Sequence, residues 1–242
     1  MIRKIYLPEI ESTNNYAAKN IEHIEDKTVI FADIQTKGKG RNGRQWFSER
    51  NNLFASLVLK PKFDLREMYK LNALIHYTAV VLSRIFKKKY SIETKIKWPN
   101  DLLANGKKIA GILIETVIKG DFLQGIIIGI GVNLNLGEKS LKKINQPAIS
   151  LNILLDREIN RDEFLDFLLK EFFLQYDQLL KQGFLLIKEE YKLKSMVLGK
   201  SVRAVTTNKE YNGIAKEIDD KGQIILDCNN IEEIINIGDI IC

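Results

Sequence analysis

The amino-acid sequence predicts an α+β fold in which a mixed β-sheet is backed by helices and followed by a segment of short strands. Three observations support this prediction. Long apolar stretches at residues 107–118 and 122–136 are typical of strands at the centre of a covered sheet. Amphipathic helical patterns occur at residues 64–88 and 160–183. From residue 199 onward, four short strand-like runs at 201–206, 211–219, 223–228 and 231–236 alternate with polar turns, which favours a small barrel or sheet.

The N-terminal part is expected to contain one helix and two strands. Residues 12–14 (Ser-Thr-Asn) are helix-capping residues, and apolar residues at helical spacing follow as far as residue 24. Strands are predicted at Thr28–Ile34 and near Leu53–Leu59. A glycine-rich loop rich in basic residues, 35–50, lies between them.

Turn signals divide the middle of the chain. The strand "TKIKW" is stopped by Pro99, because the residue before a proline is restricted to extended conformations. Asn105-Gly106 is a strong hairpin signal, and residues 119–121 (Lys-Gly-Asp) form a second turn between the two long apolar strands. One long helix is then predicted, with Asn160 as its N-cap, Glu163 at the capping-box position and Gly183 as its stop. A further helical segment ends at about residue 194.

Residues 38–43 spell the dinucleotide-binding pattern G-x-G-x-x-G, but their context contradicts that interpretation. In a dinucleotide-binding fold this loop opens directly into a helix. Here polar turn residues and then an apolar strand follow. The segment is therefore a strand, a long basic loop and another strand. A loop of this kind is able to wrap around an anionic ligand.

Composition restricts the class of protein further. The 242 residues carry 37 Lys and Arg against 31 Asp and Glu, a net charge of +6. Residues 35–50 contribute five basic residues and one acidic residue, so the excess is concentrated in one loop and favours a local anionic ligand over a long polyanion. Two cysteines and two histidines argue against a disulfide scaffold and a structural zinc site. No signal peptide or membrane span is apparent, which predicts a cytoplasmic protein.

Four polar or glycine-rich clusters interrupt the apolar strands. They are residues 12–14, residues 35–46, "KWPNDLLANGKKIAG" at 97–111 and "GIGVNLN" at 129–135. On these motifs the whole chain resembles the biotin protein ligases (biotin–[acetyl-CoA-carboxylase] ligases) in the short form without an N-terminal DNA-binding domain. "KWPND" combined with "KKIAGIL" is the most specific part of the match. The resemblance implies a class II aminoacyl-tRNA-synthetase-like sheet in residues 1–195 and an SH3-like barrel in residues 196–242.

The resemblance also implies a set of biotin-binding residues. They are Ser12, Thr13, Asn14, Gln35, Lys39, Gly40, Arg41, Lys108 and Gly111. Considered alone, residues 12–14 are more simply a helix cap, although a helix N-terminus also leaves N–H donors available to a ligand. Members of the family commonly have arginine at the position of Lys39. Lysine keeps the positive charge but lacks the bidentate geometry of a guanidinium.

A second implied set binds ATP. It comprises Gly38, Arg41, Arg44, Trp46, Asn100, Lys108, Gly131 and Asn133. Residues 38–44 would form the adenylate-binding loop, and Trp46 would stack on adenine. Each of these features has a simpler alternative when it is considered alone. The alternatives are a solvated basic loop, a tryptophan in the core and glycines at a bulge.

Catalysis is assigned by the same resemblance to Lys108, Arg41 and Asp101. The biotin carboxylate and ATP repel each other, and a fixed cation at Lys108 would relieve that repulsion and stabilise the transition state. Lys107 would face the other side of the strand, because adjacent strand residues alternate. Whether Asp101 orients the acceptor lysine or holds Mg²⁺ is left open. Mg²⁺ is expected to bind mainly through ATP, with its protein ligands unassigned.

The implied reaction converts biotin and ATP to biotinyl-5′-AMP and then transfers biotin to one lysine of a biotin carboxyl-carrier protein. Three other functions are disfavoured by the sequence. A lipoate or octanoate transferase is disfavoured by the Ser-Thr-Asn cluster together with the basic loop. An RNA-binding module would need more positive charge than the +2 that remains outside the loop. A biotin-sensing repressor would need a DNA-reading domain, so no specific DNA binding is expected. The carrier's identity, the role of the barrel and the oligomeric state, including a homodimer, are left open.

Overall fold

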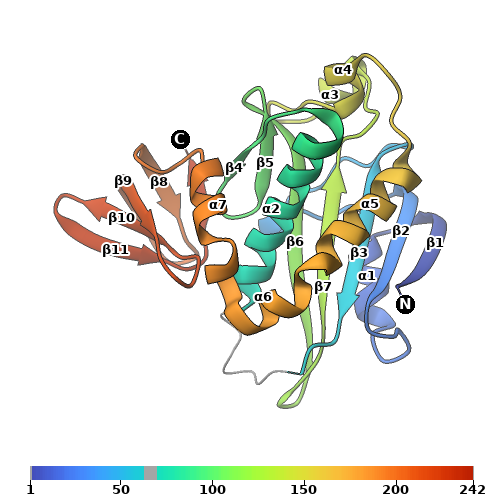
Figure 1. Ribbon diagram of the computed structural model, residues 1–242, viewed down its shortest axis with the longest axis horizontal. Coiled ribbons are helices and arrows are strands. Elements are labelled where there is room, and N and C mark those ends of the chain that lie inside the picture. Colours follow the sequence, from blue (N-terminus) through green and yellow to red (C-terminus); the bar gives the residue numbers. More distant parts are fainter. Residues whose placement is uncertain (1, 63–69, 242) are drawn as a thin grey trace. The chain divides into compact units, whose positions relative to one another are not determined.

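The computed structural model describes residues 2–62 and 70–241 of the chain, which divides into two compact units. The first consists of Met1–Met68 and Gly106–Phe167, and the second of Tyr69–Asn105 and Leu168–Cys242. Figure 1 shows the helices and strands of both units. The α+β class predicted from the sequence is confirmed, because each unit combines β-structure with helices.

The strands of the first unit form a sheet in which the two long apolar strands are neighbours. Its order is β1 (Arg3–Ile10), β2 (Thr28–Gln35), β3 (Leu53–Leu59), β7 (Phe122–Val132) and β6 (Lys107–Lys119). β1 is parallel to β2, and the other neighbours are antiparallel. The predicted strands are therefore confirmed. β1 was not predicted from the sequence, because its side chains are exposed or half-buried and leave little apolar periodicity.

The register of these strands defines one face of the sheet. Gly129 lies opposite Ser56 on β3 and opposite Leu113 on β6. Gly131, two residues further, lies opposite Gly111 on β6. Side chains directly opposite each other in a ladder share a face, as do residues two apart along a strand. The glycines thus lie on one face with Ser56.

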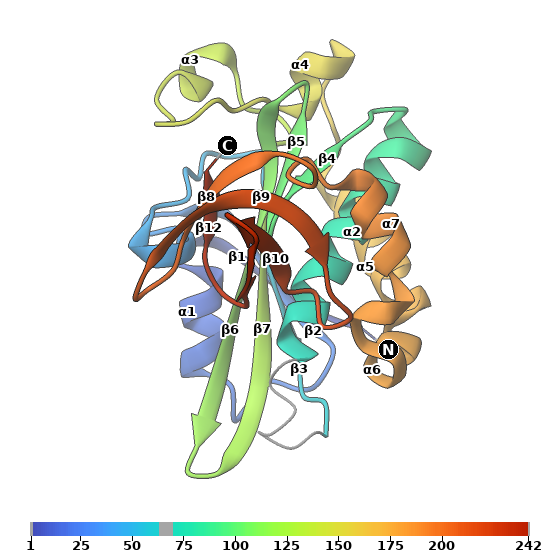
Figure 2. The ribbon, with the colours of Figure 1, turned by 90° about the vertical axis from the view of Figure 1, so that its left-hand side faces the viewer.

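Helix α1 (Thr13–Lys19) covers this face, as Figure 2 shows beside β6 and β7. Their shared core consists of Ala17, Ile21, Ile24, Ile30, Val58 and Ile127. The predicted cap is confirmed, but the helix ends before Ile21 and Ile24. The side-chain amide of Asn20 donates to the carbonyl of Tyr16, which satisfies a backbone acceptor near the helix end. The two isoleucines are buried all the same.

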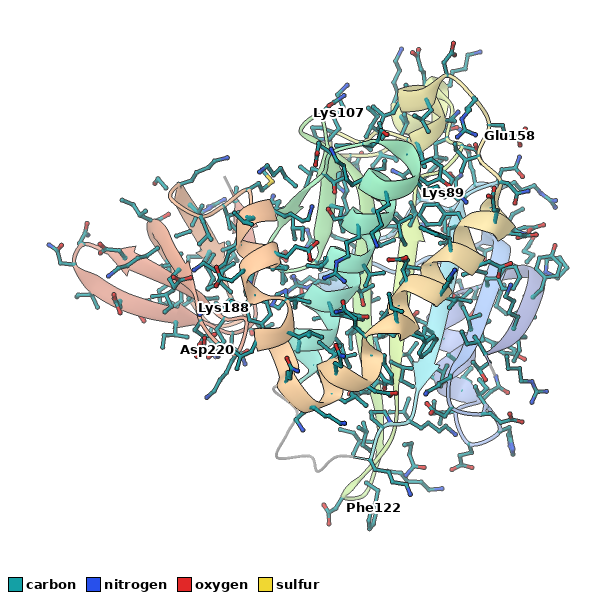
Figure 3. The ribbon with its side chains drawn as sticks, in the orientation of Figure 1. Lys89, Lys107, Phe122, Glu158, Lys188 and Asp220 are labelled. Atoms are coloured by element: carbon teal, nitrogen blue, oxygen red, sulfur yellow. The ribbon has the colours of Figure 1, made fainter. Side chains whose placement is uncertain are left out.

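Both predicted turns are confirmed. Asn105 and Gly106 have positive φ angles of 50° and 72°, as the central residues of a two-residue hairpin turn require. Gly120 has a φ of 58° between β6 and β7. Next to it, Phe122 is 73% exposed at the tip of this hairpin, as Figure 3 shows. Two short helices that the sequence analysis missed follow β7, namely α3 (Glu138–Leu141) and α4 (Leu151–Leu155).

The second unit contains several helices that pack together. Helix α2 is described from Lys70 to Tyr90, so its predicted beginning at residue 64 lies outside the described residues. The strands β4 (Lys95–Lys97) and β5 (Asp101–Ala104) pair antiparallel. α2 contacts α6 (Tyr176–Gln182), the 3₁₀ turn η3 (Gly183–Leu186) and α7 (Lys188–Lys194). Lys188 forms an ion pair of 2.7 Å with Asp220, and both side chains are labelled in Figure 3.

The predicted long helix at residues 160–183 is two helices, α5 (Arg161–Leu174) and α6. Its ends were predicted correctly. Asn160 accepts a hydrogen bond from the backbone of Glu163 at 3.0 Å, and Gly183 has a φ of 61°. Near the break, the hydroxyl of Tyr77 donates to the carbonyl of Phe172 at 2.5 Å, so a side chain from α2 satisfies this acceptor.

The C-terminal segment of the second unit is an antiparallel sheet. Its order is β11 (Ile231–Ile235), β10 (Ile224–Cys228), β9 (Glu210–Ile218), β8 (Ser201–Val205) and β12 (Asp239–Ile241). One face is buried through Val202, Ala204, Ala215, Leu226 and Ile240. The four predicted strands are confirmed, and the three-residue β12 was missed. Closure of this sheet into an SH3-like barrel stays a prediction.

Candidate ligand-binding site on the first unit

The N-terminus of α1 lies against the sheet through buried polar side chains. Ser12 caps the helix and accepts a hydrogen bond from the backbone of Asn15 at 3.4 Å. Thr13 donates twice to the side-chain oxygen of Gln35, from its backbone at 2.8 Å and from its hydroxyl at 3.0 Å. Because Gln35 ends β2, these bonds attach the helix N-terminus to the beginning of the basic loop.

Asn14 continues this network onto strands β6 and β7. Its amide lies against the bare backbone of Gly129, where an added Cβ would come within 2.5 Å of Oδ1. The amide nitrogen donates to the carboxylate of Glu115 on β6 at 2.7 Å. The hydroxyl of Ser56 lies within hydrogen-bond distance of both Thr13 and Asn14. The glycine is therefore required here by the close approach of a side chain.

The basic loop is a compact turn built from backbone hydrogen bonds. Trp46 donates to the carbonyl of Gly38 at 2.9 Å, and Gly40 donates to the carbonyl of Arg44 at 2.7 Å. Arg41 lies in a short 3₁₀ turn, and Asn42 has a φ of 54°. Arg41 is half-buried and Arg44 is exposed. The loop thus places several cations and backbone N–H groups beside the sheet.

Trp46 lies on a surface made by two glycines. A Cβ at Gly131 would come within 2.4 Å of the indole ring, and one at Gly111 within 2.8 Å. Since these glycines are register partners on β7 and β6, the ring contacts bare backbone on both strands. The indole Nε1 is buried and has no hydrogen-bond partner among the described residues. The resemblance implies that Gly111 contacts biotin. In this structure, the side chains of Trp46 and Lys108 lie beside Gly111.

Lys108 extends over the same surface. Its Nζ lies 5.2 Å from the centroid of the Trp46 ring, a cation–π contact. Its backbone is fixed on both sides, because Lys108 donates to the carbonyl of Pro147 and accepts from the backbone of Ile149, both at 2.9 Å. Lys107 is exposed, as Figure 3 shows. The two neighbouring lysines therefore differ in environment, as strand alternation predicts.

Asn133 holds the backbone around Lys108. Its amide nitrogen donates to the carbonyl of Ile149 at 3.0 Å and to that of Lys108 at 3.4 Å. Its backbone donates to Ile109 at 2.9 Å. Asn133 is buried, so these bonds replace contacts with water. In this structure its amide donors serve the protein backbone, and its implied contact with the nucleotide stays a prediction.

The first unit therefore brings together most of the residues singled out from the sequence. Two of them, Asn100 and Asp101, belong to the second unit at the beginning of β5, and their roles stay predictions. Three further residues of the site, Ser48, Ser56 and Glu115, were not predicted from the sequence. Ser48 accepts from Gln35 at 3.3 Å and donates to the carbonyl of Trp46 at 3.1 Å. Ser56 was detectable as the one polar residue of an apolar strand, and Glu115 as an acidic residue within a mostly apolar strand.

The arrangement suits an extended ligand. Gly129 and Gly131 are two residues apart on one strand, so the contact sites of Asn14 and Trp46 are about 7 Å apart along β7. One end offers amide and hydroxyl groups for a polar head. The other offers an aromatic face, the cation of Lys108 and a basic loop, which suit an anionic, aromatic group such as a nucleotide.

The fold and site define a class of enzyme that attaches cofactor acids to proteins, and the comparisons agree. Residues 6–133 match the biotin/lipoate A/B protein ligase family, and residues 197–242 match the biotin protein ligase C-terminal domain. The chain belongs to the biotin/lipoate A/B protein ligase family. Biotin protein ligases are among its relatives in that family.

Among these relatives is the biotin–[acetyl-CoA-carboxylase] ligase of Paracoccus denitrificans, 33% identical over 91% of this chain and 92% of that protein. The bifunctional ligase/repressor BirA of Bacillus subtilis is 34% identical over 92% of this chain and 68% of its own length. Among solved structures, the biotin protein ligase of Aquifex aeolicus in complex with biotin and ATP superposes with a TM-score of 0.84. It is 26% identical, and the match covers 100% of this chain and 98% of that one.

Proposed function

We propose that this chain is a biotin protein ligase that works in two steps. In the first step, a carboxylate oxygen of biotin attacks the α-phosphorus of ATP, and the bond to pyrophosphate breaks, which gives biotinyl-5′-AMP. In the second step, the ε-amine of a carrier lysine attacks the acyl carbon. The amide forms as AMP leaves, and the amine loses a proton.

The observation that supports this proposal most is the common face of β6 and β7. Asn14 lies on Gly129 at one position, and Trp46 with Lys108 lies on Gly111 and Gly131 at the other. A biotin ring among Ser12, Thr13, Asn14 and Gln35 would direct its carboxylate toward Lys108 and the basic loop. The positive charges there would neutralise carboxylate and phosphate as they react. Positioning and electrostatics suffice, and no protein nucleophile is needed.

Mg²⁺ fits this site as a companion of the nucleotide. Within residues 2–62 and 70–241, no group of three His, Cys, Asp or Glu side chains is placed to hold a metal ion. Phosphate oxygens are good ligands for Mg²⁺, which often binds proteins mainly through its nucleotide. We therefore assign the ion to ATP, where it would neutralise phosphate charge.

We assign residues 1–195 to catalysis and residues 196–242 to an SH3-like domain. The acceptor would be a biotin carboxyl-carrier protein, in the cytoplasm. The absence of sequence-specific DNA binding stays a prediction, tested by footprinting at increasing salt, where nonspecific affinity falls steeply. No helix in the described part of the chain is both long and apolar enough to span a membrane.

The decisive experiment incubates the purified protein with biotin, α-labelled ATP and Mg²⁺ and isolates protein-bound biotinyl-adenylate. A carrier domain added afterwards should gain biotin on one lysine. Replacement of biotin by lipoate is the matched control. Transfer of lipoate without transfer of biotin would overturn the substrate assignment.

A further inference from the structure

Glu115 joins two parts of the candidate site that are far apart in the sequence. It lies on β6, opposite Ile127 on β7, and its side chain is 35% exposed. One carboxylate oxygen accepts the hydrogen bond from Asn14 at 2.7 Å. The other lies 3.6 Å from the ammonium of Lys39 in the basic loop. One acidic side chain therefore contacts both the N-terminus of α1 and the loop.

The position of Glu115 in the sheet explains why it reaches both. Residues 111, 113 and 115 of β6 point to the same face by strand alternation, so Glu115 shares that face with Gly111 beneath Trp46. It is a charged residue in a mostly apolar strand. An ionised side chain at a half-buried position is costly unless it is paired. Asn14 and Lys39 supply the partners.

The ion pair with Glu115 is an interaction that a lysine at position 39 makes well. A single ammonium makes a point contact with one carboxylate oxygen, whereas a guanidinium is built for bidentate contacts. Because its ammonium is directed at Glu115, the side chain of Lys39 forms an ion pair within the protein. Lys37, two residues earlier, pairs instead with Glu11 at 2.6 Å.

We propose that Glu115 is a positioning residue that fastens the basic loop to Asn14 through Lys39 and so keeps the loop closed over the reaction intermediate. This inference rests on the proposed function, because the loop's task is to retain biotinyl-adenylate. Both side chains of the pair are partly exposed, so the expected effect is modest. Loss of such an ion pair changes an equilibrium by about two- to fivefold.

The test separates the charge of Glu115 from its hydrogen bond. Glu115→Gln keeps an oxygen that accepts from Asn14 but removes the ion pair, and Lys39→Gln removes the same pair from the other side. Each variant should release preformed biotinyl-adenylate about two- to fivefold faster than the parent protein in a chase with unlabelled substrates. The double variant should be no faster than either single one, because both remove one interaction. Lys39→Arg keeps the positive charge and should retain the intermediate as the parent protein does, and Lys37→Gln should also leave retention unchanged.

A second measurement does not depend on ligands. Hydrogen exchange of residues 39–45 in the ligand-free protein should be faster in Glu115→Gln and in Lys39→Gln, with the unfolding free energy unchanged. Additive effects in the double variant, or unchanged exchange and release in both single variants, would overturn the role of Glu115. Failure of the parent protein to form any adenylate would instead refute the proposed function, and the exchange data would still decide whether Glu115 holds the loop.

Discussion

Gly111 and Gly131 lie directly opposite each other on β6 and β7, and the indole ring of Trp46 occupies the space where their side chains would be. Two bare backbones side by side make a flat surface that a large aromatic ring can contact closely. The ring is fixed from the loop side as well, by the backbone bond from Trp46 to Gly38. The orientation of this tryptophan is thus set by the sheet and the loop together.

Gly131→Ala should displace Trp46. The added Cβ would lie 2.4 Å from the indole, so ring or strand must move, and overpacking of this kind costs about 1–3 kcal/mol. If Trp46 contacts the nucleotide, the KM for ATP should rise at least about tenfold, with a smaller effect on the KM for biotin. Steady-state pyrophosphate release measures both. Gly137→Ala is the control, because no atom lies within 4 Å of its added Cβ. Equal KM values in the two variants would contradict the role of this surface.

Lys108→Ala should reduce adenylate synthesis by about a hundredfold or more, as expected for the loss of one preorganised electrostatic contact. Lys108 is held by backbone bonds on both sides, so the substitution removes the charge from a rigid position. Lys107→Ala is the matched control on the exposed side of the same strand and should retain activity. Pyrophosphate release in a single turnover is the measurement. Synthesis near the parent rate in Lys108→Ala would show that the central role assigned to this lysine is wrong.

Arg41→Gly should separate synthesis of the intermediate from its retention. Arg41 lies in the loop, not on a strand, and glycine tolerates the backbone conformations of that turn. The variant should keep substantial adenylate synthesis but release the product, so that lysines of a bystander protein become biotinylated. Label on serum albumin, measured together with pyrophosphate release, reports this. Loss of synthesis without any label on albumin would argue that Arg41 acts in the chemical step.

Asn133→Ala should weaken both stability and activity. The substitution removes two donors that reach the carbonyls of Lys108 and Ile149 in a buried setting. The carbonyl of Lys108 keeps the hydrogen bond from the backbone of Ile149, but the carbonyl of Ile149 loses this donor. A buried acceptor left unsatisfied costs about 1–3 kcal/mol in the free energy of unfolding. Urea unfolding should show this loss, and kcat for adenylate synthesis should fall because Lys108 is less firmly placed. A fall in activity at unchanged stability would favour a direct contact of Asn133 with the nucleotide.

Asp33 should make stability depend on pH in the acid range. Burial alone would raise the pKa of its carboxyl, but hydrogen bonds from Arg161 and Tyr6 outweigh that effect and lower the pKa below 3.8. Its contribution to stability is therefore fully present above pH 3.8 and is lost as the pH falls through the lower folded-state pKa. Asp33→Asn should be less stable than the parent at pH 7, and the difference should shrink toward pH 2. Urea unfolding at both pH values measures it, and a difference independent of pH would contradict the assignment.

The sequence alone determined the features that depend on local backbone chemistry. The cap at Ser12, the hairpin turn at Asn105 and Gly106, and the helix stop at Gly183 each follow from conformations that only a few residue types favour. The sequence also predicted the strands from their apolar runs and the motifs from their polar clusters. The break between α5 and α6 was not predictable, because Tyr77 and Phe172, which meet near it, are far apart in sequence.

The contacts that make the site were decided only by the tertiary structure. The register between β6 and β7 places Gly111 opposite Gly131, and a shift of one residue would turn one of them to the other face. That register depends on the whole ladder and on an irregularity at Val117 and Ile118, which no local pattern reveals. For the same reason Ser56 and Glu115 appeared in the sequence only as polar residues inside apolar strands. Long-range strand pairing brings them against the N-terminus of α1, where a hydroxyl and a carboxylate acquire partners.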